Sequence, residues 1–183
     1  WSMPLSYDGA FCAIEDGAGM YYMSIQSGRV IKATVDATGT MTAYRRMEPM
    51  GGTGYDFINP FIIDPVDNNV MYLSAGTRLW RNDDLSSIAL TNEWDSISQG
   101  WMKFSGVAVG NISAFGPTYS GSHTLYIGTD NGKIYKLDSA HTSDPVFTDI
   151  RNNIVGSGFI SSISVDPRDD NKILVVFSNY NVH

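Results

Sequence analysis

Acidic side chains are the first residues of this chain whose type could do chemistry. Hydrolysis of a glycosidic bond uses two carboxylates about 5 to 9.5 Å apart. Several acidic residues are available, among them Asp8, Asp56, Asp83, Asp84 and Asp95. Asp83 and Asp84 are adjacent, and adjacent side chains of an extended segment point to opposite faces. The sequence therefore predicts a solvated turn there and assembles no catalytic acid and base.

Aromatic rings could bind a ligand instead, because sugar rings stack on exposed aromatic faces. Trp94 and Trp101 flank a stretch rich in Ser, Gln and Gly, and Tyr119 lies in a later predicted loop. These three are the candidate ligand-binding residues. Other large rings are expected to pack between sheets, as amphipathic rings most often do. The rings expected in the core are Trp80, Tyr126 and Tyr135.

Two loops rich in Asp and Asn, residues 64–69 and 166–171, could supply oxygen ligands for Ca²⁺. Both lack the twelve-residue spacing and the bidentate Glu of an EF-hand. A structural turn is favoured, because Pro fixes φ and the preceding Asp can cap the following backbone donors. The residues of these turns are Asp64, Pro65, Asp166 and Pro167. We expect no metal site and no cofactor, with Ca²⁺ as the alternative left open.

The histidines and the cysteine give no further site. His123, His141 and His183 are scattered and match no metal-binding motif. Cys12 is the only cysteine, so no intrachain disulfide can form. It lies in an apolar run without a cationic or His neighbour in sequence. We therefore expect it to be buried and inert.

Composition sets limits on the class of protein. The chain has 183 residues, of which 43% are hydrophobic, enough for one domain with a substantial core. Twelve basic and nineteen acidic residues give a net charge of −7, which disfavours binding to nucleic acid phosphates. No apolar run is long enough to span a membrane. The chain opens at Trp1 without a signal sequence, so we expect an interior or processed piece.

A pattern repeats along the chain at a spacing close to fifty residues. The Asp-Pro pairs at 64–65 and 166–167 lie 102 positions apart, which is two such periods. Short apolar runs recur at residues 20–24, 70–74, 124–128 and 172–176. Self-similarity at about 40 to 50 residues with strand-like composition is typical of the blades of a β-propeller.

Glycine-rich turns divide the repeats into short strands, and no helix is predicted. We expect an all-β fold, a partial β-propeller of four-stranded antiparallel blades, as one segment over residues 1–183. It contains about three and a half blades in an incomplete ring, with the fourth strand of the second blade around Glu93–Ile97. The expected blades cover residues 8–50, 57–105 and 110–153, with a half blade at 158–183.

A ring needs about four to eight blades to close, and an unclosed ring exposes apolar edges. The open edges are therefore expected to be covered by the remainder of a larger propeller or by a partner chain. The alternative is that residues near Trp1–Leu5 complete a small ring of four blades.

Asn131-Gly132 is the strongest local hairpin signal. It separates two alternating apolar runs, and a type I′ turn at this place requires positive φ at both turn residues. We therefore predict a tight hairpin between strands at residues 125–129 and 133–137.

Four segments, residues 79–83, 128–135, 163–167 and 175–180, carry a resemblance to a known family. They resemble secreted bacterial β-propellers of the sortilin/Asp-box (BNR) type. The chain is also similar to the propellers of xyloglucanase-like glycoside hydrolases and to type IX-secreted surface proteins. An Asp remains in each turn between third and fourth strands, but the Gly and Trp of the Asp box are displaced. The resemblance implies a propeller fold and an extracellular or cell-surface location, and it supplies no catalytic residue.

The leading hypothesis is an extracellular propeller module that binds protein or glycan through loops at the ends of the ring. In the part seen it contains no assembled catalytic group. One alternative is a fragment of a glycoside hydrolase acting on polysaccharide. Another is a component of a surface adhesin or filament. None of these predicts a nucleic acid partner or a membrane span.

Overall fold

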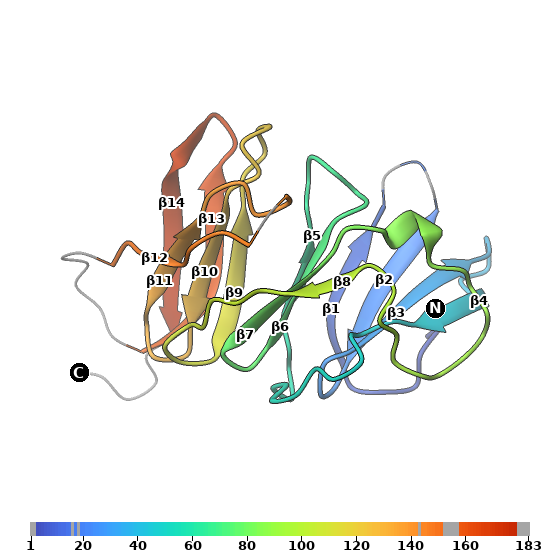
Figure 1. Cartoon of the computed structure of the whole chain (residues 1–183). Coiled ribbons are helices and arrows are strands. Elements are labelled where there is room, and N and C mark those ends of the chain that lie inside the picture. The colour runs from blue at the N-terminus through green and yellow to red at the C-terminus, as the bar shows by residue number, and fades with distance from the viewer. Residues whose placement is uncertain (1–2, 16, 18, 143, 152–157, 179–183) are drawn as a thin grey trace.

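The computed structural model in Figure 1 describes residues 3–15, 17, 19–142, 144–151 and 158–178. It is all-β, and within each sheet every strand pairs antiparallel with the next one in sequence. The described residues form three sheets of four strands and one sheet of two. The sheets stand side by side as separate blades and do not close into a ring (Figure 1). The expected partial β-propeller is therefore confirmed.

The strands follow one another without crossovers. Blade 1 comprises β1 (Gly9–Ile14), β2 (Met20–Ile25), β3 (Arg29–Val35) and β4 (Met41–Arg46). Blade 2 comprises β5 (Phe61–Ile63), β6 (Met71–Ala75), β7 (Arg78–Asn82) and β8 (Trp101–Lys103), with a 3₁₀ turn at Leu85–Ser87. Blade 3 comprises β9 (Ile112–Pro117), β10 (Leu125–Thr129), β11 (Ile134–Leu137) and β12 (Thr148–Asp149). The half blade comprises β13 (Phe159–Asp166) and β14 (Asp169–Ser178).

The alternation of side chains along β6 explains why the blades stack. Met71 and Leu73 join Tyr22 and Val30 in a buried cluster between blades 1 and 2. Tyr72 points the other way, into the cluster between blades 2 and 3. Successive side chains of a strand project to opposite faces, so a strand buried on both faces has apolar side chains at successive positions. The one polar side chain of β6, that of Ser74, is buried and donates to the Pro60 carbonyl.

The same arrangement recurs in β10. Tyr126 packs with Ile160 and Ile163 of the half blade, while Ile127 packs toward blade 2. The tyrosine in the second strand of each blade therefore faces the following sheet. Gly128 is required at this contact, because a Cβ there would lie 2.5 Å from the Ile160 side chain.

The prediction of a fourth strand at Glu93–Ile97 is wrong, because β8 occupies that place in blade 2. Residues 88–100 instead leave blade 2 and lie along the outer strand of blade 1. The backbone N–H of Asn92 donates to the carbonyl of Tyr44 over 2.8 Å. Such pairing covers an edge strand that would otherwise expose unpaired backbone groups.

The predicted type I′ turn at Asn131-Gly132 is also wrong. Gly132 has φ +82°, whereas Asn131 does not adopt positive φ. The Gly132 N–H donates to the Thr129 carbonyl, and the Thr129 N–H donates to the Lys133 carbonyl, each over 3.1 Å. This is a three-residue hairpin loop in which one left-handed glycine follows a turn.

Cys12 is exposed, contrary to the expectation of a buried thiol. It lies in an apolar cleft of about 320 Å³ whose lining includes Met3, Tyr7 and Phe11. The apolar run around it was expected in the core, but it lies on an open face of blade 1. Among the described residues, no further sheet packs over that face.

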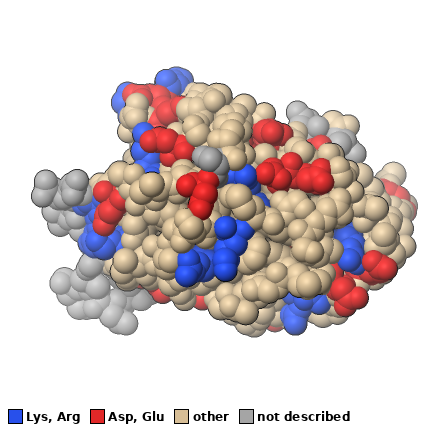
Figure 2. Space-filling view, viewed as in Figure 1, with Lys and Arg blue, Asp and Glu red and all other residues tan. Residues whose placement is uncertain are grey.

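The opposite end of the arc is open in the same way. Leu174 and Val176 of β14 are exposed, whereas Val175 between them packs against blade 3. Figure 2 shows acidic and basic side chains interspersed over the viewed face, without a basic stripe. None of the helical structure in the described residues is long and apolar enough to cross a membrane.

Candidate functional site

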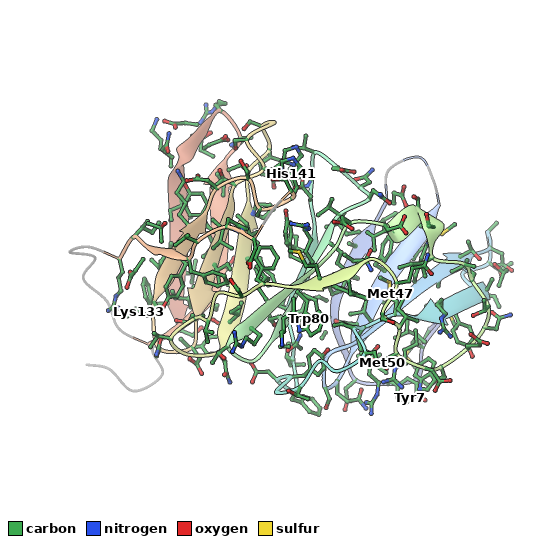
Figure 3. All side chains as sticks on the ribbon, in the orientation of Figure 1. Tyr7, Met47, Met50, Trp80, Lys133 and His141 are labelled. Atoms are coloured by element: carbon green, nitrogen blue, oxygen red, sulfur yellow. The ribbon has the colours of Figure 1, made fainter. Side chains whose placement is uncertain are left out.

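Two ends of the blade stack carry different loops. One end, which we call the loop end, carries the blade-to-blade connections at residues 47–60 and 104–111 and the turns that join the second strand of each blade to the third. The seam end carries the other two connections of each blade. Figure 3 places Met50 and Lys133 toward the loop end and His141 at the seam end.

Large apolar side chains are exposed at the loop end. They come from the two blade-to-blade connections and are 46% to 61% exposed: Met50, Phe57, Ile58, Val107 and Val109. The two connections are adjacent, since the Asn111 amide donates to the Asp56 carboxylate over 3.3 Å. Grouped apolar exposure of this kind marks interaction sites on soluble proteins.

These connections are held in place by buried hydrogen bonds. Asn59 is fully buried, and its amide donates to the Ser74 carbonyl while its oxygen accepts from the Asp56 N–H. The N–H of Val109 donates to the Tyr135 hydroxyl over 2.9 Å. The exposed side chains therefore stand on ordered backbone, which lowers the entropic cost of binding a partner.

A polar cleft of about 170 Å³ opens beside Phe57's connection. Its lining includes Arg29, Arg46, Glu48 and Tyr55. Arg46 pairs with Glu48, and the Arg46 Nε donates to the Glu48 carboxylate over 2.6 Å. Arg29 makes one long bond, from Nη1 to the Gln26 carbonyl over 3.4 Å.

The Tyr55 hydroxyl is the unsatisfied group of this cleft. It is buried and has no hydrogen-bond partner among the described residues. Burial raises the pKa of this phenol well above its ordinary value, with the Glu48 charge acting in the same direction. The Tyr55 hydroxyl therefore stays protonated, and Arg29 leaves the cleft with net positive charge because the charges of Arg46 and Glu48 cancel. The chemistry of the cleft suits an anionic group such as a carboxylate.

A small polar network joins the two connections beside the apolar residues. Asp56 accepts from Asn111, whose backbone N–H donates to the Asp130 carboxylate over 3.0 Å. Burial raises the pKa of the Asp56 carboxyl; the bond from Asn111 opposes this and the charge of Asp130 adds to it. A carboxylic acid with a raised pKa beside a second carboxylate is a combination that acid–base chemistry can use.

The predicted ligand-binding aromatics are not brought together. Trp94 is stacked on Tyr7 at 5.8 Å and edge-on to Tyr44 at 5.9 Å, so neighbouring rings occupy it. Trp101 lies in β8, and its Nε1 donates to the Met47 carbonyl over 2.6 Å. Tyr119 is exposed, but it lies in the connection between β9 and β10 of blade 3.

The expected core aromatics divide. Tyr126 and Tyr135 are buried. Trp80 is only partly buried, and the Lys103 ammonium lies 5.9 Å from the centre of its ring. The long Lys103 side chain therefore contributes to covering the Trp80 ring.

The predicted Asp-Pro turns use their carboxylates on their own backbone. Asp64 Oδ1 accepts from the N–H groups of Val66 and Asp67 over 2.9 and 3.2 Å. Asp166 Oδ1 accepts from the Arg168 N–H over 3.0 Å. No group of three or more acidic, His or Cys side chains within the described residues could hold a metal ion.

Sequence reasoning missed a cluster at the seam end. The second oxygen of Asp64 pairs with His123 Nδ1 over 2.9 Å, and His123 stacks on His141 with ring centres 3.7 Å apart. Asp64 belongs to blade 2 and both histidines belong to blade 3. No local motif marks these residues, because their contact depends on how adjacent blades meet.

No family model matches the sequence, and no curated protein matches it. Among solved structures, the chain is similar to the holo form of the pyranose dehydrogenase PQQ domain from Coprinopsis cinerea. The identity is 15% and the TM-score is 0.49, over 92% of this chain and 42% of that chain. The chain thus spans less than half the length of that structure. A likeness at this level carries nothing about a ligand or activity of this chain.

Proposed function

We propose that this chain is a non-catalytic binding segment of an extracellular or cell-surface β-propeller. It recognises a protein partner through the loop end. The observation that carries the proposal is the exposure of five large apolar side chains on ordered connections of two adjacent blades. Isolated apolar residues on a surface need no explanation, but grouped ones do.

A protein partner fits these residues better than a glycan. Sugar rings are held by exposed aromatic faces, and the exposed apolar residues here are four aliphatic side chains and one Phe. The tryptophans that could have formed a sugar platform are packed against other groups. Protein interfaces, in contrast, bury apolar centres within a polar rim.

The polar cleft adds a preference for charge. A carboxylate of the partner would accept from the Arg29 guanidinium, which within the described residues makes one long bond, to the Gln26 carbonyl. The favoured ligand is therefore a peptide segment with large apolar residues and an acidic one beside them. Charge-assisted bonds of this kind fix orientation as well as strength.

The test is selection of a displayed random-peptide library on the folded protein, followed by calorimetric titration of the selected peptides. We expect acidic and apolar residues to be enriched. We expect Phe57→Ser and Arg29→Gln each to weaken binding by about tenfold, as loss of an anchor does. Val146→Ser is the matched control, since Val146 is 80% exposed but lies outside the loop end.

Selected peptides that bind equally well to all three variants would overturn the proposal. So would tight binding of soluble polysaccharides, screened in parallel, that the Phe57 variant abolishes. The second result would favour a glycan as the natural ligand of the same surface.

A glycoside hydrolase fragment is the second candidate, favoured by the raised pKa of Asp56 beside Asp130. If it is correct, soluble polysaccharides release reducing sugar and Asp56→Asn abolishes the release. If the intact protein releases no reducing sugar, the hydrolase function is excluded and the binding function is the one that remains.

The proposal that this chain is a segment of a propeller also concerns the exposed faces of β1 and β14. We propose that further propeller sheets or a partner chain cover them. An adhesin or filament component would use them for self-assembly, which sedimentation of the purified protein measures.

A further inference from the structure

Four ionisable side chains meet at the seam between blades 2 and 3. Asp64 is buried and pairs with His123 Nδ1 over 2.9 Å. The Tyr72 hydroxyl also reaches Asp64, over 3.5 Å. The His123 ring stacks on the His141 ring with planes inclined by 24°. His141 lies between blade 3 and the β5–β6 connection in Figure 3.

Arg81 of blade 2 completes this seam and holds the chain around His141. It is 2% exposed, and its Nη1 donates to the Ala140 carbonyl over 2.9 Å. Its Nη2 donates to the Thr142 carbonyl over 3.2 Å and pairs with Asp83 over 3.1 Å. A buried cation therefore already stands next to the residue whose charge would change.

The surroundings of His141 oppose its protonation. Burial lowers the pKa of its imidazole, and the adjacent His123 and Arg81 lower it further, while Asp64 and Asp67 oppose them. Its Nδ1 is buried with no hydrogen-bond partner in the described part of the chain. The stacked arrangement is thus built for a neutral His141.

We propose that this seam is an acid-sensitive junction, closed while His141 is neutral and loosened when His141 takes up a proton. A proton on His141 adds a cation at stacking distance from His123 and next to the buried Arg81, where the Asp64 carboxylate is already paired with His123 and the Asp83 carboxylate with Arg81. Like charges held together in a poorly solvated place repel strongly.

The sign of the pH dependence follows from the lowered pKa. An unfolded histidine titrates near 6.5, so above that value both states are neutral and the seam is fully stable. As pH falls below it, the open state takes up a proton that the closed state resists. Stability of the seam is therefore present at neutral pH and lost progressively on acidification.

The other two junctions between blades have no pair of stacked histidines among the described residues. Blades 1 and 2 are joined by Lys32, whose ammonium donates to the carbonyls of Leu85 and Ile88. Blade 3 and the half blade are joined by the carboxylate of Asp170, which accepts from Ser122 over 2.7 Å. Neither seam contains a described histidine, so acid should loosen one junction rather than the whole fold.

The first test uses the unmodified protein and amide hydrogen exchange at pH 7.5 and 5.5, corrected for intrinsic rates. We expect amides at the seam, such as those of Asp64 and Ala140, to exchange about tenfold faster at pH 5.5. Amides of the β2–β3 pair serve as the internal control and keep their rates. Equal changes in both groups, or none at the seam, would overturn the proposal.

The second test is His141→Phe, which keeps a stacked ring but cannot titrate. We expect the fall in Tm from pH 7.5 to 5.5 to be smaller than in the parent protein by a few degrees, about 2 to 4 °C. His183→Gln removes another histidine and should retain the parental fall. An equal fall in the His141 variant would contradict the inference. If that variant does not fold, the exchange measurement decides.

Discussion

The loop end and the seam end of this propeller segment use polar and apolar groups in opposite ways. At the loop end, large apolar side chains face solvent, and the buried Tyr55 hydroxyl has no hydrogen-bond partner among the described residues. At the seam end, Asp64 and Arg81 are buried. Asp64 pairs with His123 and Arg81 donates to the Ala140 carbonyl, both in the neighbouring blade. We propose that the loop end binds an external partner, whereas the seam end holds adjacent blades together. Changes at the seam end should therefore affect stability, and changes at the loop end should affect binding.

The largest expected effect comes from Arg81→Met. It leaves the Ala140 and Thr142 carbonyls without their donor and should lower the free energy of unfolding by about 3 kcal/mol. Arg78→Met is the matched control, because its guanidinium donates to the Ser105 carbonyl at the surface and should cost under about 0.5 kcal/mol. Urea unfolding measures both. Equal losses would show that the seam contributes no special stability.

Gly28→Ala should give the next largest effect. Gly28 has φ +72°, and a Cβ would lie 2.2 Å from the Tyr55 ring. An alanine there is therefore strained, and it pushes the Tyr55 ring out of its place in the lining of the polar cleft. We expect a loss of roughly 2 kcal/mol, together with weaker binding of selected peptides. Gly121→Ala has open space around its Cβ and should change neither quantity. Parental peptide binding by the Gly28 variant would separate the cleft from the binding surface.

A double change on β14, Leu174→Lys with Val176→Lys, should give the smallest effect on stability. Both side chains are exposed, so the free energy of unfolding should stay within about 0.5 kcal/mol. Self-association in sedimentation velocity should decrease, because charge on an open apolar face opposes stacking. Unchanged association would exclude this face as a contact surface.

Much of the blade architecture could be predicted from the sequence, since it depends on short-range patterns. The recurring tyrosine, seen in Tyr72 and Tyr126, occupies one place in each blade because the alternation of a strand aims it at the next sheet. The Asp64 turn could be recognised because its carboxylate bonds to N–H groups two and three residues later. These contacts are local, so their signals are local too.

The failures have a common physical reason. Cys12 lies in an apolar run that reads as core, yet no described sheet covers its face. The segment around Asn92 was predicted to pair within its own blade, but it pairs with Tyr44 of the preceding one. Asn131 avoids positive φ because the hairpin spreads its turn over three residues. In the first two cases the outcome depended on which segment of the fold lies against the residue, and in the third it depended on one extra turn residue.

The amino-acid sequence by itself determined the period of the repeat, the strands of the blades and the carboxylate-capped turns, because these rest on alternation and on bonds between near neighbours. Only the tertiary structure decided which residues meet across the blades. It placed His123 on Asp64, joined two separate blade-to-blade connections through Asn111 and Asp56, and packed Trp94 and Trp101 against other groups. Such contacts join residues tens of positions apart, and only the stacking of one sheet on the next determines them.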